Sequence, residues 1–412
     1  MPRPIETSSL SPARLDRLRS VAAAAFLFLA PFPASAGWRL FALLVAAAAL
    51  VAQAVRAYPS ALPPRLPRAV AITAAAWIAI CVISLAWSEN ARYTLGELQG
   101  EILYGALAFA VFYAGTREPR DVHIAVRVLL AGALLLGFFE WLRFALPDVR
   151  YAPRYEAIQG YFSTHLVMVA ALLTFLAWPR PLGLAAPRGV LILVAIGLVL
   201  AGAATENRML WFAVAAGALV AYAAYRHAFP SSPAALRAWL AGFAVIVLFA
   251  FASWWHKAET YYPQAADAAA AVTFDQRPLI WRSALSLAVQ KPVLGHGYGR
   301  EIVGDAIEKL LVAGGLDLPF RHGHNVFIDA VLQVGVAGLA IFVALLASLA
   351  LTYARALRRP DLAPVGIAGL ALLAGYVVKN LTDDFHHRPD SMVFWALQGL
   401  LLSLATRPRR AA

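Results

Sequence analysis

The sequence predicts an all-helical protein that crosses a membrane about twelve times and carries one large outer loop with short helices. Hydrophobic residues make up 61% of the 412 residues, and charged residues make up only 14%. Soluble domains carry roughly 25% charged residues, so this composition disfavours a soluble fold. The apolar stretches are hydrophobic on every face instead of alternating, which favours membrane helices over membrane strands.

Each predicted span is an apolar stretch long enough to cross the hydrocarbon core, which takes about 20 residues. We place the spans at 20–37, 38–56, 69–87, 98–115, 122–145, 161–178, 189–205, 209–225, 237–255, 337–356, 362–380 and 391–406. They predict a single membrane domain over residues 1–412, with the large loop at 256–323. The first stretch, followed by Ala34-Ser35-Ala36, also resembles a cleavable signal peptide, and we expect it to be retained.

Arginine residues collect in alternate connections between the spans, which predicts the orientation of the chain. Because cytoplasmic loops carry an excess of Lys and Arg, the arginine-rich side and both termini are expected to be cytoplasmic. The net charge of +12 follows from these connections. The sequence has no contiguous basic stripe with interleaved aromatic residues, so nucleic-acid binding is disfavoured. The polar motifs described next all fall on the opposite, outer side.

A pair of histidines stands where the large loop ends and an apolar helix begins, at His322-Gly323-His324-Asn325. A neutral histidine at the membrane surface can act as a general base near neutral pH. Two other roles stay open at this point. The histidines can serve as interfacial caps, or as zinc ligands, for which an isolated His-x-His pair is weak evidence.

The segment from Asp275 to Ala288 predicts a short amphipathic helix on the outer surface. Asp275 is a suitable N-cap, and an apolar stripe follows at helical spacing: Ile280, Ala284, Leu287 and Ala288. Arg277 and Trp281 share one face of this helix. Arg277 can hold a phosphate with bidentate geometry. The alternative is an arginine that snorkels beside an interfacial tryptophan.

Glycines alternate with other residues in Gly295-His296-Gly297-Tyr298-Gly299. We expect a tight, closely packed loop there. It is not a dinucleotide-binding fingerprint, because no strand precedes it.

Two further polar groups interrupt the apolar pattern. Arg208 follows Thr205-Glu206-Asn207 in a short hinge. An arginine near the bilayer needs a partner, either Glu206 or an anionic lipid headgroup. The second group lies in the last outer turn and consists of Lys379, Asp383, Asp384, His386, His387 and Arg388. We expect this turn to be solvated, and the alternative is a site for a divalent cation.

In order and spacing these motifs resemble the O-antigen ligase and O-antigen polymerase superfamily. The resemblance covers the second half of the chain in detail and rests on three motifs. The first is Arg208, and the second is Asp275, Arg277 and Trp281, followed by Pro292, Gly295 and Gly297. The third is His324-Asn325, followed by Gly335 and Gly338. Asn380-Leu381-Thr382-Asp383-Asp384-Phe385, followed by Phe394-Trp395, resembles the ligase branch. Two positions depart from the family pattern: Asn207, where a serine is frequent, and Gln333, where an acidic residue is frequent.

The resemblance implies a membrane glycosyltransferase, an O-antigen ligase of lipopolysaccharide biosynthesis. Such a ligase moves O-antigen polysaccharide from undecaprenyl pyrophosphate to a lipid A–core sugar at the periplasmic face of the bacterial inner membrane. It implies these two substrates and membrane lipids as partners, and no cofactor or metal. His324 would be the general base, and Arg208 and Arg277 would clamp the pyrophosphate during an inverting transfer. The expected substrate-binding residues are Arg321, His322, Asn325, Asp275, Trp281 and Tyr298.

Three other functions remain open on the sequence. An O-antigen polymerase or a protein O-oligosaccharyltransferase of the same superfamily would share the donor and differ in the acceptor. A twelve-span transporter or flippase is a different class. It is disfavoured because transporters keep binding residues near the bilayer midplane, often in two related halves, whereas the polar motifs here lie at one face.

Overall fold

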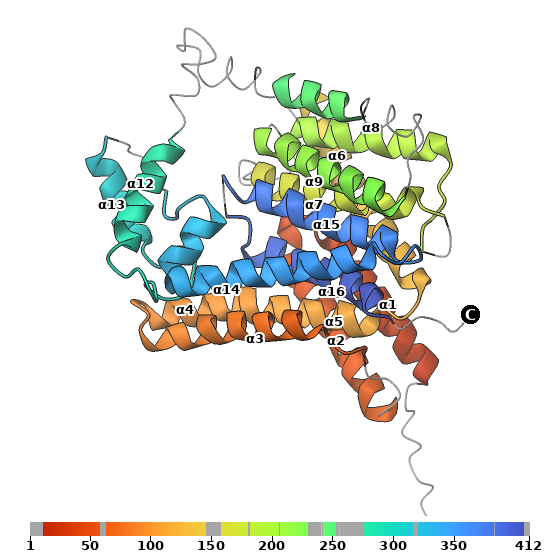
Figure 1. The fold of residues 1–412 in the computed structure, drawn as a ribbon, viewed down its shortest axis with the longest axis horizontal. Coiled ribbons are helices and arrows are strands. Elements are labelled where there is room, and N and C mark those ends of the chain that lie inside the picture. Colours follow the sequence, from red (N-terminus) through yellow and green to blue (C-terminus); the bar gives the residue numbers. More distant parts are fainter. Residues whose placement is uncertain are drawn as a thin grey trace, which may run out of the picture.

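The computed structural model describes residues 11–57, 63–145, 158–179, 182–205, 207–229, 240, 242–252, 255, 276–315, 320–382 and 384–407. Within these ranges the chain forms helices and turns without strands, as the composition predicts (Figure 1). The α-helices are α1 (Pro12–Leu29), α2 (Ala36–Ala57), α3 (Arg68–Ile83), α4 (Ala91–Glu97), α5 (Tyr104–Gly115), α6 (Pro119–Ala145), α7 (Ile158–Ala177), α8 (Arg188–Ala204), α9 (Arg208–Ala228), α12 (Arg277–Ala288), α13 (Gly304–Ala313), α14 (Val326–Ala356), α15 (Ala363–Lys379) and α16 (Arg388–Ala405).

Seven helices in the described part of the chain are long and apolar enough to cross a membrane. They are Pro33–Arg56, Arg68–Ala86, Ala91–Gly115, Pro119–Leu142, Gly160–Ala177, Arg208–Ala228 and Val326–Ala356. Shorter apolar helices occur at Arg188–Ala204, Gly242–Ala252 and Ala363–Lys379. The structure therefore supports a polytopic membrane protein, and it does not confirm the predicted number of twelve spans.

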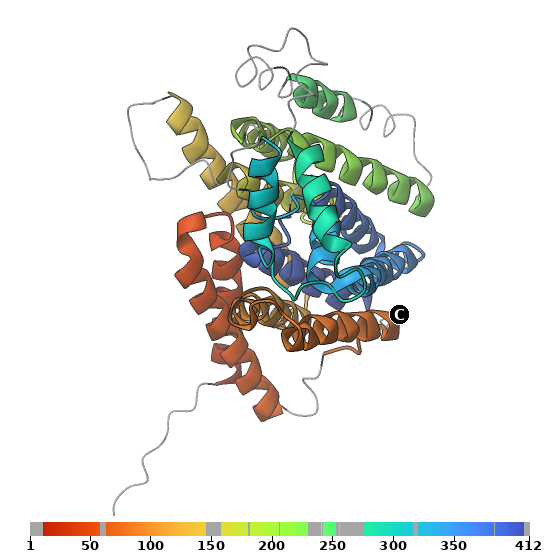
Figure 2. The ribbon, with the colours of Figure 1, turned by 90° about the vertical axis from the view of Figure 1, so that its left-hand side faces the viewer.

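The two short helices α12 and α13 lie together at one end of the bundle (Figures 1 and 2). We call this end the loop end. A separate apolar cluster joins the two helices to the start of α14 and includes Ile280, Ala284, Ile307, Leu311 and Leu332. The predicted large loop at 256–323 therefore contains packed short helices, as expected, although 256–275 and 316–319 lie outside the described residues.

Close packing of α9 against α15 depends on small residues. A Cβ placed on Gly217 would lie 3.0 Å from the Ala371 carbonyl oxygen, and one on Gly375 would lie 3.2 Å from that of Ala213. Larger side chains would therefore push the two helices apart. Small residues allow such close helix approach within membranes.

The long helix α14 is broken, which the sequence did not predict. Val334 and Gly335 leave the helical conformation, with Gly335 at φ 68° and ψ −174°. A residue with a Cβ rarely adopts this φ, whereas glycine does so at no steric cost. The predicted helix from Asn325 and the predicted span at 337–356 are thus two pieces that meet at Gly335.

The glycine-rich loop at 292–299 fills this break through backbone hydrogen bonds. The N–H groups of His296 and Gly297 donate to the carbonyl oxygens of Leu332 and Gln333 at 2.8 and 2.9 Å. In return the Val336 N–H donates to the Pro292 carbonyl oxygen at 2.9 Å. Because an unsatisfied buried backbone group is costly, the loop supplies the partners that the broken helix lacks. The predicted tight, closely packed loop is therefore confirmed.

The turn before α4 supports the glycine-rich loop from the opposite side. The Glu89 N–H donates to the His296 carbonyl oxygen at 3.0 Å, and the Glu89 carboxylate lies 2.6 Å from His296 Nδ1 and 2.8 Å from Lys291 Nζ. The indole N–H of Trp87 donates to the Leu294 carbonyl oxygen at 3.0 Å. The N-terminal half of the chain thus holds the loop in place.

Gly335→Ala should destabilise the protein strongly. The added Cβ would lie 2.0 Å from the Val293 carbonyl oxygen, and the φ of 68° adds backbone strain of about 1–3 kcal/mol. We expect a clear fall in the midpoint of thermal unfolding of the purified protein in detergent. Gly37→Ala is the matched control, because nothing lies within 4 Å of its Cβ. Equal unfolding midpoints for the two variants would contradict a tight junction at Gly335.

Candidate active site

The helix α12 presents Arg277 at its first turn. The four residues of the predicted apolar stripe are all buried, which confirms the amphipathic helix: Ile280, Ala284, Leu287 and Ala288. Gln276 precedes the helix, and the expected cap, Asp275, lies outside the described residues. Arg277 Nε donates to the Thr382 carbonyl oxygen at 2.8 Å. The indole Nε1 of Trp281 is buried without a hydrogen-bond partner among the described residues.

Asn325 caps the N-terminus of α14 and ties it to another part of the chain. Its Oδ1 accepts hydrogen bonds from the N–H groups of Phe327 and Ile328 at 2.9 and 3.3 Å. Its Nδ2 donates to the Leu381 carbonyl oxygen at 2.9 Å. The helix therefore starts at the histidine motif, as predicted, and the cap also positions that motif against residues 379–382.

His322 is buried and held between two charged groups. Its Nδ1 lies 3.4 Å from Oδ2 of Asp329, which is fully buried, and its Nε2 faces Arg300. A guanidinium can only donate. His322 Nε2 therefore accepts from Arg300, and the His324 N–H donates to His322 Nδ1 at 3.1 Å. This arrangement fixes the orientation of the His322 ring.

His324 lies above His322 and is half-exposed. The two imidazole rings stack with centroids 3.9 Å apart and an interplanar angle of 24°. The ring of Phe320 meets His324 edge-on at 5.0 Å. His324 has a φ of 47°, in the left-handed region that histidine tolerates better than bulky apolar residues. The turn thus holds the His324 ring on a buried platform while leaving it accessible.

Arg208 begins α9, next to a contact between α9 and α15. Lys379 Nζ donates to Oδ1 of Asn207 at 3.2 Å, and the same oxygen caps α9 by accepting from the Leu210 N–H at 3.3 Å. Arg208 is half-buried. Glu206, its predicted partner, lies outside the described residues.

The four residues 379–382, which we call the hub segment, join the three motifs. Lys379 contacts the Asn207-Arg208 motif, and the Thr382 carbonyl contacts Arg277. Between them, the carbonyl oxygens of Asn380 and Leu381 accept from the Val326 N–H at 3.0 Å and from Asn325 at 2.9 Å. Because adjacent Cα atoms are about 3.8 Å apart, the hub segment brings three distant sequence motifs to one place.

Two other predicted substrate-binding residues have contacts within the protein. Arg321 forms ion pairs with three carboxylates, those of Glu301, Asp305 and Glu308, at 3.1, 2.5 and 3.0 Å. Tyr298 is 2% exposed, and its hydroxyl donates to Glu101 Oε2 at 2.6 Å. These contacts place both residues as supports of the surrounding loops, and their contact with a substrate stays a prediction.

Three charged or polar residues of the last turn before α16 are buried, so the expectation of a solvated turn was wrong for them. Lys379, Asp384 and His386 are 1%, 4% and 7% exposed, while Asp383 lies outside the described residues. The helices α14, α15 and α16 enclose this turn, a tertiary effect that spacing along the chain does not reveal. Burial, together with the charge of Asp329, raises the pKa of Asp384 to about 8, and burial lowers the pKa of His386 to about 4.

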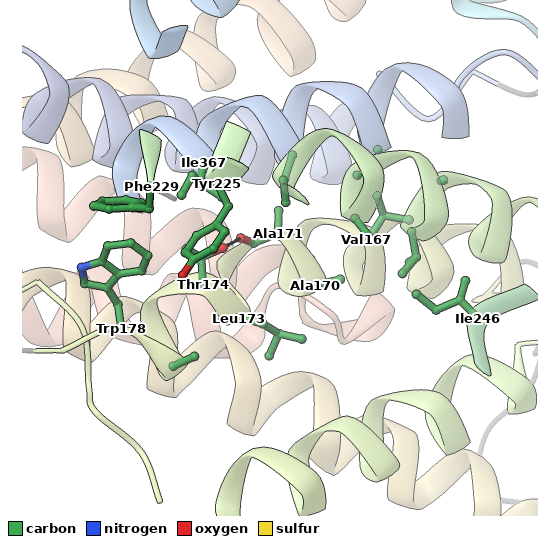
Figure 3. A pocket seen from close by; sticks show the side chains of 18 of the residues that line it. Val167, Ala170, Ala171, Leu173, Thr174, Trp178, Tyr225, Phe229, Ile246 and Ile367 are labelled. Carbon is green, nitrogen blue, oxygen red and sulfur yellow. Dashed lines mark hydrogen bonds between the residues drawn. The ribbon is translucent and has the colours of Figure 1, made fainter. Parts of the chain in front are cut away.

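A large apolar groove approaches the hub segment along α7, α9 and α15. Its volume is about 910 Å³, and Val167 and Ile246 line one end (Figure 3). Ala213, Gly217, Ala371 and Gly375 also line the groove. Trp178, Tyr225 and Phe229 line the other end. Ala213 is five residues beyond Arg208, which is about 7.5 Å along a helix, and Gly375 is one turn before Lys379. The groove therefore ends close to two cationic side chains, Arg208 and Lys379, although the residues that line it are uncharged.

The sequence analysis missed several residues that build the site. Asp329, Arg300 and the pair formed by Lys379 and Asn207 were not assigned a role. The signal for Asp329 was a carboxylate in the apolar first turn of α14, because a buried carboxylate needs a partner. For Arg300 no comparable signal exists, since its partner His322 is 22 residues away.

The fold and site describe a polytopic membrane protein with a buried polar centre at one end. Residues 189–343 match the family model of O-antigen ligase, which confirms the resemblance predicted from the motifs. A comparison with curated proteins finds no significant match. The matched segment runs from α8 into α14 and contains Arg208, Arg277, His322 and His324. This part of the chain is therefore similar to the O-antigen ligase family.

Substitutions at Asn325 should separate its two structural roles. Asn325→Ala removes both the helix cap and the tether to Leu381, and we expect a loss of about 1–2 kcal/mol. Asn325→Ser keeps a capping oxygen but has no amide donor, so its loss should be smaller. The readout is the midpoint of thermal unfolding. Asn90→Ala, which removes the cap of α4 only, is the control, and an Asn325→Ala loss no larger than this would argue against the tether.

Proposed function

We propose that this protein is an O-antigen ligase, which transfers O-antigen polysaccharide from undecaprenyl pyrophosphate to a sugar of lipid A–core. The observation that carries the proposal is the convergence of three motifs on the hub segment, through Asn207 beside Arg208, through Arg277 itself and through Asn325 beside His324. Together with the match to the family model, the contacts of all three motifs with one turn support a site with two cations and a base. We further propose that this end faces the periplasm of a bacterial inner membrane and that both termini are cytoplasmic.

The apolar groove supports a lipid-linked donor. An isoprenoid tail needs an apolar surface that continues into the bilayer, and the groove between α7, α9 and α15 offers one. Its end near Arg208 and Lys379 places the pyrophosphate of such a donor beside fixed positive charge. A nucleotide-sugar donor would have no use for a groove of this kind.

In the proposed reaction the acceptor hydroxyl oxygen attacks the anomeric carbon of the glycan. His324 takes the hydroxyl proton as the new glycosidic bond forms. The bond between the anomeric carbon and the phosphate oxygen breaks, and undecaprenyl pyrophosphate leaves with the bonding electrons. Direct attack from the opposite face inverts the anomeric carbon.

Arg208 and Arg277 would stabilise the negative charge that develops on the leaving pyrophosphate. Their cationic side chains can do this without a metal ion, because fixed charges act in the same electrostatic way. His322 would orient His324 through the stacked rings, and the contact of His322 with Asp329 would keep that platform rigid. Trp281, beside Arg277 on α12, is proposed to contact the donor.

The related functions differ from ligation only in the acceptor. An O-antigen polymerase would use the same donor and a second lipid-linked glycan, and a protein O-oligosaccharyltransferase would use a protein hydroxyl. The end of the chain resembles the ligase branch at Asn380–Phe385 and Phe394-Trp395, which is why ligation is placed first. A transporter is disfavoured, because in the described residues the three motifs converge at one end of the bundle.

His324→Ala should abolish ligation while the protein remains folded, because the acceptor hydroxyl loses its base. The measurement is complementation of a ligase-deficient Gram-negative strain, read as the lipopolysaccharide ladder on a gel at equal membrane abundance. His227→Ala, an exposed histidine at the far end of α9, is the control and should restore the ladder. A full ladder from His324→Ala would refute the base assignment. If wild type gives no ladder and lipid-linked glycan accumulates, the result would favour an O-antigen polymerase or a protein O-oligosaccharyltransferase over a ligase.

Ala218→Phe should weaken use of the lipid donor, because the new ring would occupy the apolar groove that Ala218 lines. We expect the apparent KM for the lipid-linked donor to rise about 10-fold, the loss that about 1.4 kcal/mol of binding energy produces, with a smaller change in kcat. Leu219→Phe is the matched control, because Leu219 is 52% exposed and does not line the groove. An equal KM for both variants, measured in vesicles, would argue against the groove as the tail site.

A further inference from the structure

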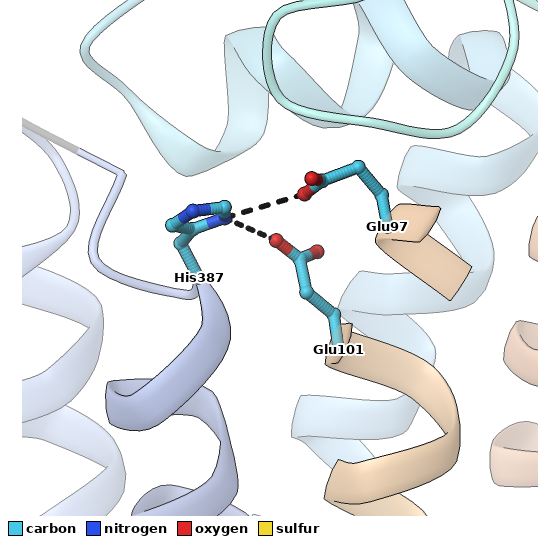
Figure 4. Close-up of side chains that lie close together, drawn as sticks. All are labelled: Glu97, Glu101 and His387. Carbon is cyan, nitrogen blue, oxygen red and sulfur yellow. Dashed lines mark hydrogen bonds and ion pairs between the residues drawn. The ribbon is translucent and has the colours of Figure 1, made fainter. Parts of the chain in front are cut away.

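A cluster of two carboxylates and a histidine contains none of the groups assigned to transfer. It contains Glu97 at the end of α4, Glu101 in the π-helical turn η3 (Leu98–Leu103), and His387, which precedes α16. One ligand atom from each side chain lies within 4.8 Å of the other two (Figure 4). Single π-helical turns are frequent at functional sites. Oxygen and imidazole nitrogen together form a donor set that suits a divalent transition metal.

Each carboxylate uses one oxygen for a partner outside the cluster. Glu101 Oε2 accepts from the Tyr298 hydroxyl at 2.6 Å, and Glu97 Oε1 accepts from Arg388 at 2.7 Å. The second oxygen of each carboxylate, Glu101 Oε1 and Glu97 Oε2, faces His387 Nδ1 (Figure 4). Outer contacts of this kind orient carboxylate ligands in metal sites.

Glu97 Oε2 is the atom that points most directly to a ligand. Glu97 is 2% exposed, and its Oε2 has no hydrogen-bond partner among the described residues. It lies 3.6 Å from His387 Nδ1, on the side of the carboxylate that faces the cluster. Leaving a buried carboxylate oxygen without a hydrogen bond costs free energy, and a cation between the three side chains would remove that cost.

We propose that Glu97 Oε2, Glu101 Oε1 and His387 Nδ1 bind one divalent cation of the zinc class. Zinc ligands at 2.0–2.2 Å in a tetrahedral arrangement lie about 3.3 Å from one another, and the three atoms here all lie within 4.8 Å of one another. The two carboxylates balance the charge of the ion. The fourth position is open to water, because the His387 side chain is 25% exposed.

Such an ion would join the segment of α4 and η3 to the start of α16. These segments are far apart in sequence, and no covalent link connects them. The ligands are none of the groups assigned to transfer, so the proposal stands whether or not the protein is a ligase. The expectation of transfer without a metal concerns Arg208, Arg277 and His324, and it is unaffected.

The test is zinc binding to the purified full-length protein in nanodiscs, after removal of any affinity tag and treatment with a chelator. Isothermal titration with ZnCl₂ should give one site per chain, and Co²⁺ should produce a visible absorption band on binding. Glu101→Gln and His387→Gln each remove a ligand and should weaken zinc binding at least about 100-fold. Tyr298→Phe removes an outer contact and should weaken it about 10- to 100-fold. The exposed His227→Gln is the matched control and should bind like wild type.

Two results would overturn the proposal: wild type without a saturable zinc site, or zinc binding that His387→Gln leaves unchanged. His387 is partly exposed, so its variant should fold even if Glu101→Gln does not. The midpoint of thermal unfolding supplies a second readout. Zinc should raise the midpoint for wild type and for His227→Gln, and it should leave the midpoint of His387→Gln unchanged.

Discussion

The rest of the structure depends on the backbone hydrogen bonds between the glycine-rich loop and the break in α14. The N–H groups of His296, Gly297 and Val336 are the donors. The carbonyl oxygens of Leu332, Gln333 and Pro292 accept these hydrogen bonds. Broken helices are tolerated in membranes where other protein groups satisfy the freed backbone. Here the same contact that satisfies the backbone also sets the direction in which the first half of α14 leaves the bundle. That half carries Asn325 at its start, and the histidines precede it.

A second constraint acts at the other end of this half-helix, where the hub segment collects the polar motifs. The hub contacts the motifs mostly through its own carbonyl oxygens, at Asn380, Leu381 and Thr382, while the Asn380 side chain holds the turn through hydrogen bonds with the Tyr376 carbonyl oxygen and the Phe385 N–H. Lys379 is the exception, with its ammonium group on Asn207 and above the ring of Phe385 at 4.1 Å. A turn of this kind can place an arginine, a histidine and a helix start together without presenting a reactive group itself.

The site therefore combines rigid support with one accessible ring. His322, Asp329 and Arg300 are held in buried or half-buried contacts, whereas His324 is half-exposed on top of them. Preorganised groups lose little freedom when a substrate binds, which is a general requirement for efficient transfer. The apolar groove ends nearby, so a lipid-linked substrate and a polar acceptor can meet at one boundary between membrane and water.

The sequence by itself determined the helical membrane class, the amphipathic helix α12, the helix start at Asn325 and the family resemblance. These features depend on composition and on spacing of a few residues, which local physics controls. Only the tertiary structure decided the break at Gly335, the burial of the turn at Asp384 and His386, and the partners of Arg277 and Lys379. Each of these depends on contacts between residues distant in sequence, such as Arg277 with Thr382, 105 positions apart. Periodicity carries no information about such pairs, because it reports which face of a helix is apolar and not which element covers that face.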